Sequence, residues 1–147
     1  MDFLTALHIS TTGLTTQRTR MNVISTNLAN VNTTRTQSGD PYRRKVVLME
    51  AKPVEDFESA LRLSLKPEEE ELHGVGVREI AADRTPFRRV YSPGHPDADQ
   101  MGYVSYPNVN VITEMADMMI SKRSYEANVT AISATKGMAL KALEIGR

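Results

Sequence analysis

The last forty residues of the chain read NVNVITEMADMMISKRSYEANVTAISATKGMALKALEIGR, from Asn108 to Arg147. Projected at about 100° per residue, this stretch predicts one long helix with two apolar faces. Larger side chains form a seam on one face, at Met115, Met118, Tyr125, Val129, Ile132, Ala139 and Leu143. A smoother face, built largely from alanine, comprises Ile112, Ala116, Met119, Ile120, Ala127, Ala131, Ala134, Met138, Ala142 and Ile145. Polar strips separate the two faces, and one of them carries Asp117, Ser124 and Asn128.

The second apolar face is the feature that needs a partner. A helix that covers an ordinary core requires only one apolar stripe, so two stripes predict burial on both sides, in a bundle or between subunits. We do not expect a chain of 147 residues to bury both faces by itself.

The N-terminal part of the chain predicts a second long helix, from about Asp2 to Asn32. Its apolar positions follow heptad spacing at Leu7, Leu14, Met21 and Leu28, with Ile24 and Val31 in the companion positions. Threonines occupy the opposite face, at Thr5, Thr12, Thr16, Thr19 and Thr26, and β-branched residues lower intrinsic helix propensity. This helix therefore needs a partner seam, and the simplest closure packs the two terminal helices antiparallel as a coiled-coil arm.

The middle of the chain predicts a small, turn-rich β region. Strand propensity is concentrated in Tyr42 to Ala51, Gly74 to Ile80, Phe87 to Tyr91 and Gly102 to Tyr106, while Phe57 to Lys66 fits a strand or a short helix. The predicted fold class is therefore α+β. Residues 1–34 form the N-terminal core helix, residues 35–107 the loop and β-rich region, and residues 108–147 the C-terminal core helix.

Composition excludes several classes of function. Eighteen basic and eighteen acidic side chains cancel, so no global field favours nucleic acid or an anionic membrane. The absence of cysteine excludes disulfides and thiolate chemistry. No apolar run approaches the length of a membrane span, and the N-terminus lacks the basic and apolar regions of a cleavable signal peptide.

Candidate catalytic and metal-binding groups are weak. His95, Asp97 and Asp99 lie close together in SPGHPDADQ, but the prolines and glycine there favour a surface loop, and no second cluster completes a coordination shell. His8 and His73 have no nucleophile at an evident spacing. We expect no enzymatic activity, no metal and no other cofactor.

Two short basic clusters, Arg43 to Lys45 and Arg88 to Arg89, could meet phosphate or an acidic partner. Without interleaved exposed aromatic residues or a recognition helix, nucleic acid is not the expected partner. An acidic surface on a neighbouring subunit fits better, and the run Glu68 to Glu71 is one candidate for it.

Several motifs resemble the flagellar rod and hook family over nearly the whole chain. They are ISTTGLTTQRTRMNVISTNLANVNTT with the following YRRK, then GVRE, TPFRRVYSPGHPDADQMGYV, and the C-terminal YPNVNVITEMADMMISKRSYEANVTAISATKGMALKALEIG. The family motif places Asn27, Leu28, Ala29, Asn30, Asn32 and Thr33 at one end of the chain and Tyr125, Ala127 and Asn128 at the other. PGHPDAD and YPNVNV point to a proximal-rod component within that family. The acidic segment Glu58 to Leu72 departs from the family pattern.

The resemblance implies a structural subunit of the proximal rod. Members of the family are similar in pairing their terminal helices and polymerising helically into a shaft that transmits torque from the motor to the distal rod and hook. One apolar face would then pair the two terminal helices and the other would meet neighbouring subunits. Implied partners are further copies of the chain, the rod proteins FlgB, FlgF, FlgG and FliE, and the type III export apparatus, which delivers subunits to the periplasm without a cleavable signal. A non-flagellar adaptor with coiled-coil arms is the alternative.

Overall fold

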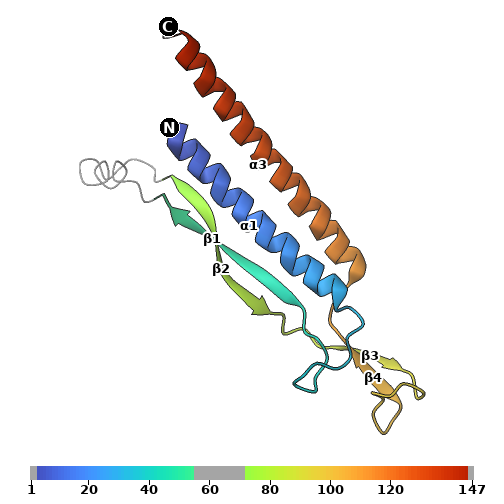
Figure 1. The fold of residues 1–147 in the computed structure, drawn as a ribbon. Helices are drawn as coiled ribbons and strands as arrows, with labels where there is room; N and C mark the ends of the chain where they lie inside the picture. The colour runs from blue at the N-terminus through green and yellow to red at the C-terminus, as the bar shows by residue number, and fades with distance from the viewer. Residues whose placement is uncertain (1–2, 55–71, 146–147) are drawn as a thin grey trace. The chain divides into compact units, whose positions relative to one another are not determined.

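The computed structural model describes residues 3–54 and 72–145 and has an α+β architecture (Figure 1). Its elements in chain order are helix α1 (Phe3–Ala29), strands β1 (Lys45–Pro53), β2 (His73–Ala82), β3 (Arg88–Tyr91) and β4 (Tyr103–Tyr106), and helix α3 (Val111–Ile145). The prediction of two long terminal helices around a small β region is confirmed. The element predicted within Phe57 to Lys66 lies outside the described residues.

The four strands form two separate two-stranded sheets, β1 with β2 and β3 with β4. The Asp83 amide donates to the Arg44 carbonyl at 2.8 Å, and the Val54 amide donates to the Leu72 carbonyl at 3.0 Å, so β1 and β2 run antiparallel. In the second sheet, the antiparallel register pairs Arg88 with Tyr106 and Tyr91 with Tyr103.

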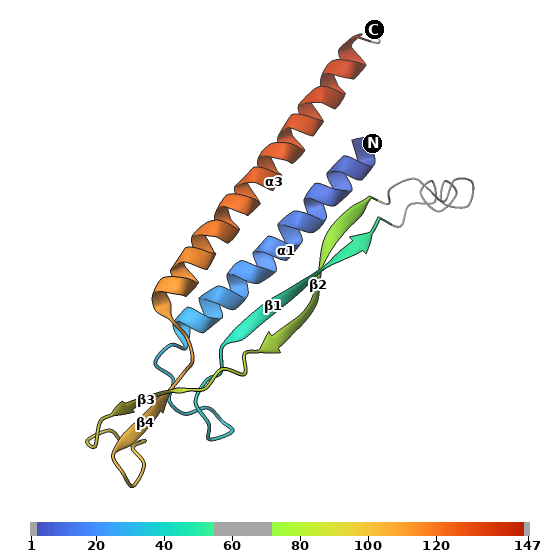
Figure 2. The same ribbon diagram turned by 180° about the vertical axis from the view of Figure 1, so that it is seen from behind.

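The chain divides into two compact units. The first comprises Met1–Thr19, Met49–Arg78 and Lys122–Arg147, and the second comprises Arg20–Leu48 and Glu79–Ser121. Each unit contains a section of α1, a section of α3 and a section of the β1–β2 hairpin. Within each unit, the α1 section lies between the other two, and the two helical sections run antiparallel (Figure 2).

Packing in the first unit depends on small and hydroxylated side chains. Gly13 is buried, and a Cβ atom there would lie 2.9 Å from the amide nitrogen of Asn128 on α3. On the sheet side of α1, the Thr16 hydroxyl donates to the Val75 carbonyl at 3.2 Å, and the Thr12 hydroxyl accepts from the Val75 amide at 3.3 Å. Part of the threonine face predicted to oppose the apolar seam is therefore bound to β2.

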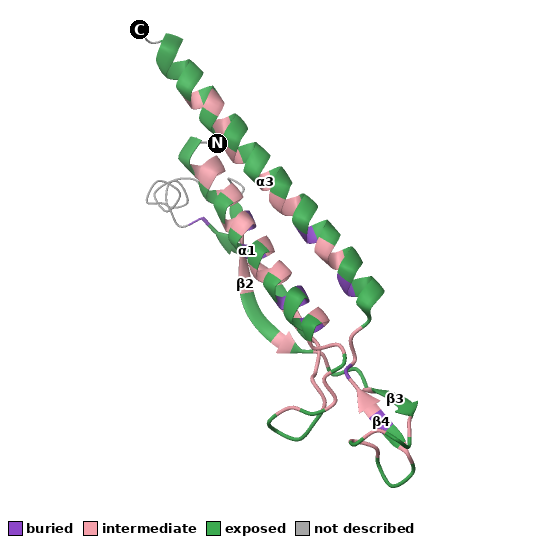
Figure 3. Ribbon diagram, turned by 45° about the vertical axis from the view of Figure 1, so that its right-hand side comes forward, coloured by how far each residue is buried: buried purple, intermediate pink, exposed green. Residues whose placement is uncertain are grey.

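The apolar core is small. Among residues 3–54 and 72–145, the buried apolar side chains are Val23, Ile24, Val54 and Val104, and the buried polar ones are Thr16, Asn27, Glu114 and Ser121. Exposed residues cover most of the outward surface of α3 (Figure 3). None of the described helices is long and apolar enough to cross a membrane. Few apolar side chains are thus fully buried within one chain, and polar side chains make up half of the fully buried set.

Candidate assembly surface and its polar junction

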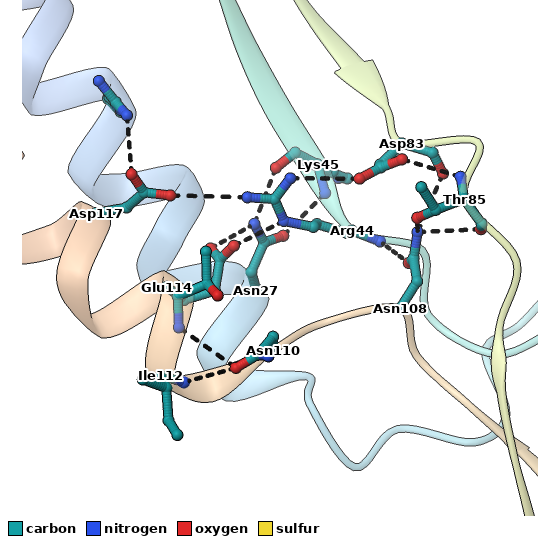
Figure 4. A network of polar contacts seen from close by, with 12 residues as sticks. Asn27, Arg44, Lys45, Asp83, Thr85, Asn108, Asn110, Ile112, Glu114 and Asp117 are labelled. Carbon is teal, nitrogen blue, oxygen red and sulfur yellow. Dashed lines mark hydrogen bonds and ion pairs between the residues drawn. The ribbon is translucent and has the colours of Figure 1, made fainter.

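A buried asparagine side chain is the centre of the second unit. Asn27 is only 1% exposed, and the oxygen and nitrogen of its side-chain amide both bond the Lys45 backbone. Its Oδ1 accepts from the Lys45 amide at 2.9 Å and from the Tyr42 hydroxyl at 3.0 Å. Its Nδ2 donates to the Lys45 carbonyl at 2.9 Å and to Glu114 Oε2 at 3.0 Å (Figure 4). All four hydrogen-bonding positions of the amide are used, so the side chain pairs with β1 as a neighbouring strand would.

Glu114 connects α3 to Asn27 and to Arg44. Its side chain is 1% exposed, and its Oε1 accepts a hydrogen bond of 2.7 Å from Arg44 Nε. A buried carboxylate is tolerated only when it is paired and hydrogen-bonded. Asn27 and Arg44 together supply both requirements, one from α1 and the other from the chain just before β1.

Arg44 forms ion pairs with three carboxylates. Besides Glu114, its guanidinium lies 3.3 Å from Asp83, which follows β2, and 3.8 Å from Asp117 on α3. Asp117 also accepts a hydrogen bond of 3.1 Å from Arg20 on α1. The planar guanidinium presents five donors in fixed directions, which is why one arginine can hold several elements at once. We call Arg20, Asn27, Arg44, Asp83, Glu114 and Asp117 the junction.

The electrostatics of the junction follow from this geometry. Burial lowers the pKa of Arg44, but the hydrogen bonds and charges of Glu114 and Asp83 outweigh it, so the net shift is upward. The pKa of Tyr42 is raised by burial and by the charge of Glu114. The pKa of Asp83 is lowered, first by a backbone hydrogen bond from Thr85 and then by Arg44. The raised pKa of Arg44 and the lowered pKa of Asp83 therefore both favour the charged forms of this pair at neutral pH.

The YPNVNV motif supplies the anchor and the cap of α3. The Asn108 side chain accepts from the Arg44 amide at 2.8 Å and donates to the Thr85 hydroxyl at 2.7 Å. Asn110 is the N-cap, since its Oδ1 accepts from the Ile112 amide at 3.0 Å and from the Thr113 amide at 3.3 Å (Figure 4). These contacts fix where the helix begins.

The residues of the predicted family motif have different surroundings. Asn27 lies in the junction, and the Asn30 side chain accepts from the Thr33 hydroxyl at 3.2 Å. Asn128 contacts the position of Gly13 in the first unit. Leu28 and Tyr125 are half-buried, whereas Ala29, Asn32 and Ala127 are exposed.

The predicted packing residues divide by burial within this single chain. On α1, Ile24 is buried, whereas Leu7, Leu14, Met21 and Leu28 are half-buried, as is Val31 just beyond the helix. On α3, the seam residues Met118, Tyr125, Ile132 and Ala139 are half-buried, whereas Met115, Val129 and Leu143 are exposed. Every residue of the smoother α3 face is exposed, including Ala127, Ala131, Ala134 and Met138. We call this smoother face the alanine face.

Sequence reasoning missed the polar side of the helix contact. The strip with Asp117 and Asn128 was expected to separate two apolar faces, but these residues lie toward α1, as Glu114 does. A helical projection places polar residues on the solvent side of the helix. It uses only the residues of that helix, so it cannot include a charged partner such as Arg44 that is distant in sequence. The only signal was the motif itself, which singled out Asn27 and Asn128 without giving their partners.

The acidic residues of the Ser92–Tyr103 loop have structural partners. Asp97 accepts a hydrogen bond of 2.7 Å from the Thr34 hydroxyl. Asp99 Oδ1 accepts from the amides of Met101 and Tyr103, each at 2.9 Å. Within the described part of the chain, no group of three His, Cys, Asp and Glu side chains could hold a metal ion. Asp99 therefore stabilises the turn before β4, and Asp97 joins the loop to Thr34.

Two family models match the ends of the chain. Residues 7–36 match the model of the flagella basal body rod protein, and residues 100–145 match the C-terminal model of the flagellar basal body rod FlgEFG proteins. The first matched range includes Asn27, and the second includes Asn108, Glu114 and the alanine face. Both matches thus cover parts of the junction.

Curated relatives match nearly the full length. The flagellar basal-body rod protein FlgC of Bacillus subtilis is 49% identical over 146 residues, covering 97% of each chain. FlgC of Borreliella burgdorferi is 39% identical, covering 99% of this chain and 98% of its own. FlgC of Escherichia coli O157:H7 is 35% identical over the whole of both chains.

Proposed function

Because the chain belongs to the FlgC family of flagellar basal-body rod proteins, we propose that it is a structural subunit of the proximal rod. The subunit polymerises helically through its terminal helices and transmits torque from the motor to the distal rod and hook. Its role is structural and not enzymatic. Full-length similarity to relatives of this name supports the proposal.

The observation that carries the proposal is the exposed apolar surface of α3. Ile112 is 80% exposed, Met119 60% and Met138 64%, all on the alanine face. Soluble monomers rarely expose large apolar patches unless another surface covers them. An interface that does not close on itself builds a filament, and a helix with one face toward its own chain and another toward neighbours suits such an interface.

The junction supports this function from within the chain. It joins both helices and both strands of the long hairpin in the second unit, so the surface that α3 presents there has a fixed register. Buried polar groups with specific partners are a well-attested means of setting register between helices. We infer that the junction fixes the assembly surface before neighbours bind it.

We propose specific partners and a route to them. The subunit contacts further copies of itself and the other rod proteins FlgB, FlgF, FlgG and FliE. The flagellar type III apparatus exports it without a cleavable signal, and it assembles in the periplasm within the flagellar basal body. The small apolar core supports passage as an unfolded chain, because little burial must be undone before export.

Incorporation into basal bodies tests the proposal. The chain would be expressed in a flagellated host that lacks its own FlgC, and basal bodies would be purified and probed for it. Ala134→Asp should reduce incorporation and swimming by at least about tenfold, because assembly would bury an unpaired carboxylate. The matched control is Ser133→Asp, which adds the same charge to the neighbouring exposed position.

Circular dichroism of the purified variants checks the fold, and neither should lose helix in the monomer. Equal incorporation of both variants would exclude the alanine face as an assembly surface. Absence of the unmodified chain from basal bodies, with stable binding to another complex, would favour an adaptor.

A further inference from the structure

The hairpin of β3 and β4 carries an exposed aromatic patch in the second unit. Tyr91 is 63% exposed, Tyr103 41% and Met101 78%. The two tyrosines face each other across the strands, with ring centroids 5.3 Å apart in an edge-on arrangement. The expectation that the basic residues here lack exposed aromatic neighbours is therefore wrong.

An arginine completes the patch. The Arg89 guanidinium lies 5.5 Å from the centre of the Tyr103 ring and donates a hydrogen bond of 2.8 Å to Asp99. Asp99 engages one nitrogen of the guanidinium, and the group has five N–H donors in total. Arg44 shows within the same unit that one guanidinium can serve three carboxylates. We call Arg89, Tyr91, Met101 and Tyr103 the tyrosine–arginine patch.

The hairpin is too small to be stable through its own contacts. It has two strands of four residues, and every residue of β3 is exposed. Isolated two-stranded hairpins are marginal in water, so cover from another surface would add stability. Tyrosine, methionine and arginine are the residue types enriched in the centres of protein interfaces.

Charge is unevenly distributed along the chain. Segment 55–71 contains seven acidic and two basic side chains. The whole chain has 18 acidic and 18 basic side chains, so 11 acidic and 16 basic ones lie outside this segment. Several of those acids are already engaged, including Asp83, Glu114 and Asp99. The unbalanced negative charge is concentrated in this segment.

We propose that the tyrosine–arginine patch binds the acidic segment 55–71 of a second copy of the chain. Arg89 contributes donors to a glutamate, and the tyrosines contribute apolar surface to Phe57 or to the leucines of the segment. The contact is heterologous, since the two surfaces differ, and it therefore suits a growing filament better than a closed dimer. This inference rests on the proposed rod function and names one surface through which copies meet.

Disulfide trapping tests the contact, because the chain contains no cysteine. Cells would co-express two tagged chains, one with Met101→Cys and the other with Ser64→Cys, and basal bodies would be isolated after mild oxidation. The mixed disulfide should exceed by at least about tenfold that formed when Ser38→Cys replaces Met101→Cys, because binding raises the local thiol concentration. Ser38 is an exposed control position in the same unit.

Charge reversal tests the chemistry. Arg89→Glu reverses the charge at position 89, and Asp99→Asn removes the paired carboxylate while retaining an oxygen to accept from the Met101 and Tyr103 amides. This change, or replacement of Glu68, Glu69, Glu70 and Glu71 by lysine in the segment, should reduce the mixed disulfide by about tenfold, because like charges then meet. Combining the reversed patch with the reversed segment on the partner chain should restore it. Arg84→Glu, at a nearby exposed position, is the control and should change the yield by less than about twofold.

The outcomes separate this inference from the proposed function. Incorporation into basal bodies is measured in the same samples, so failure of the unmodified chain to incorporate contradicts the rod function. Normal incorporation without the mixed disulfide overturns the proposed contact. An equal loss with Arg84→Glu would mean general charge attraction and would overturn the patch as a binding site.

Discussion

The two units hold their helices together by opposite means. In the second unit, buried Asn27 and Glu114 are satisfied by specific partners, and Arg44 links three carboxylates. In the first unit, α1 and α3 approach closely at Gly13, because glycine has no side chain and so leaves room for Asn128. The second unit is positioned by directional, charge-assisted bonds and the first by close approach.

The difference indicates which contacts are decisive in each unit. Removing one partner of a buried charged pair leaves the other charge buried and unpaired, which lowers the free energy of unfolding. Single substitutions in the junction should therefore be strongly destabilising. Contacts of small residues contribute through dispersion, in which each atom pair adds little. Exposed apolar residues of α3 occur in both units, with Ile112 and Met119 in the second and Met138 in the first, so neighbouring subunits should add stability to each.

The largest expected effect is Arg44→Ala. It leaves the Glu114 carboxylate buried without its cation, and such losses cost about 3 to 5 kcal/mol. Urea denaturation of the purified chain should show this decrease in the free energy of unfolding. Adding Glu114→Gln should recover part of it, because the buried group is then neutral.

Lys45→Ala is the matched control for Arg44→Ala. The exposed Lys45 takes part in the junction only through its backbone, so its truncation should cost less than about 0.5 kcal/mol. Equal losses in Arg44→Ala and Lys45→Ala would contradict the sensitivity inferred for the junction.

Much of the fold could be predicted from the sequence because local rules determine it. Heptad spacing predicted α1, and alternating or β-branched runs predicted all four described strands to within a few residues. Turn-rich segments predicted the breaks between them. Each of these signals lies within a short window of the chain, where periodicity and turn chemistry act directly.

The interior of the site could not be predicted in the same way. Glu114 is buried because Arg44, seventy positions away, pairs with it, and no local pattern encodes that distance. Thr16 was assigned to a face without a partner, yet its hydroxyl reaches the Val75 carbonyl. Polarity alone predicts exposure, and only tertiary structure shows which polar groups find partners inside.

A smaller effect is expected for Gly13→Ala in the first unit. Helix propensity favours alanine over glycine by up to about 1 kcal/mol. The added Cβ would lie 2.9 Å from the Asn128 amide, however, and overpacking typically costs about 1 to 3 kcal/mol. We expect a net loss of roughly 1 kcal/mol in unfolding free energy, and Asn128→Ala in the same chain should remove it.

Gly137→Ala is the matched control on the other helix. Nothing lies within 4 Å of a Cβ atom at Gly137, so only the propensity gain remains, and the variant should be more stable by about 0.5 to 1 kcal/mol. If Gly13→Ala also stabilised the chain, close approach would not be what positions α1 and α3.

A comparable or smaller effect is expected where α1 meets β2. Thr16→Val keeps the shape of a side chain that is 2% exposed but removes its hydrogen bond to the Val75 carbonyl. The loss should be about 1 kcal/mol in urea denaturation, as for other single hydrogen bonds. Thr15→Val is the control, because Thr15 is exposed and bonds only within its own helix. Equal changes would indicate that the Thr16 bond adds no stability.

The smallest expected effect is the pH response of the β3–β4 hairpin. The pKa of Asp99 is lowered from its ordinary value of 3.8, first by the backbone hydrogen bond from Tyr103, then by the backbone hydrogen bond from Met101 and by the side chain of Arg89. A lowered pKa means that the carboxylate stabilises the folded hairpin above pH 3.8, and that this contribution is lost as the pH falls through the folded value. Because Asp99 is exposed, solvent screening keeps the contribution small.

The amide chemical shift of Tyr103, followed by nuclear magnetic resonance in the isotope-labelled monomer, should titrate with a midpoint below 3.8 and more weakly in high salt. Asp99→Asn should abolish that titration, and a midpoint at or above 3.8 in the unmodified chain would contradict the stabilisation of the Asp99 carboxylate by these hydrogen bonds.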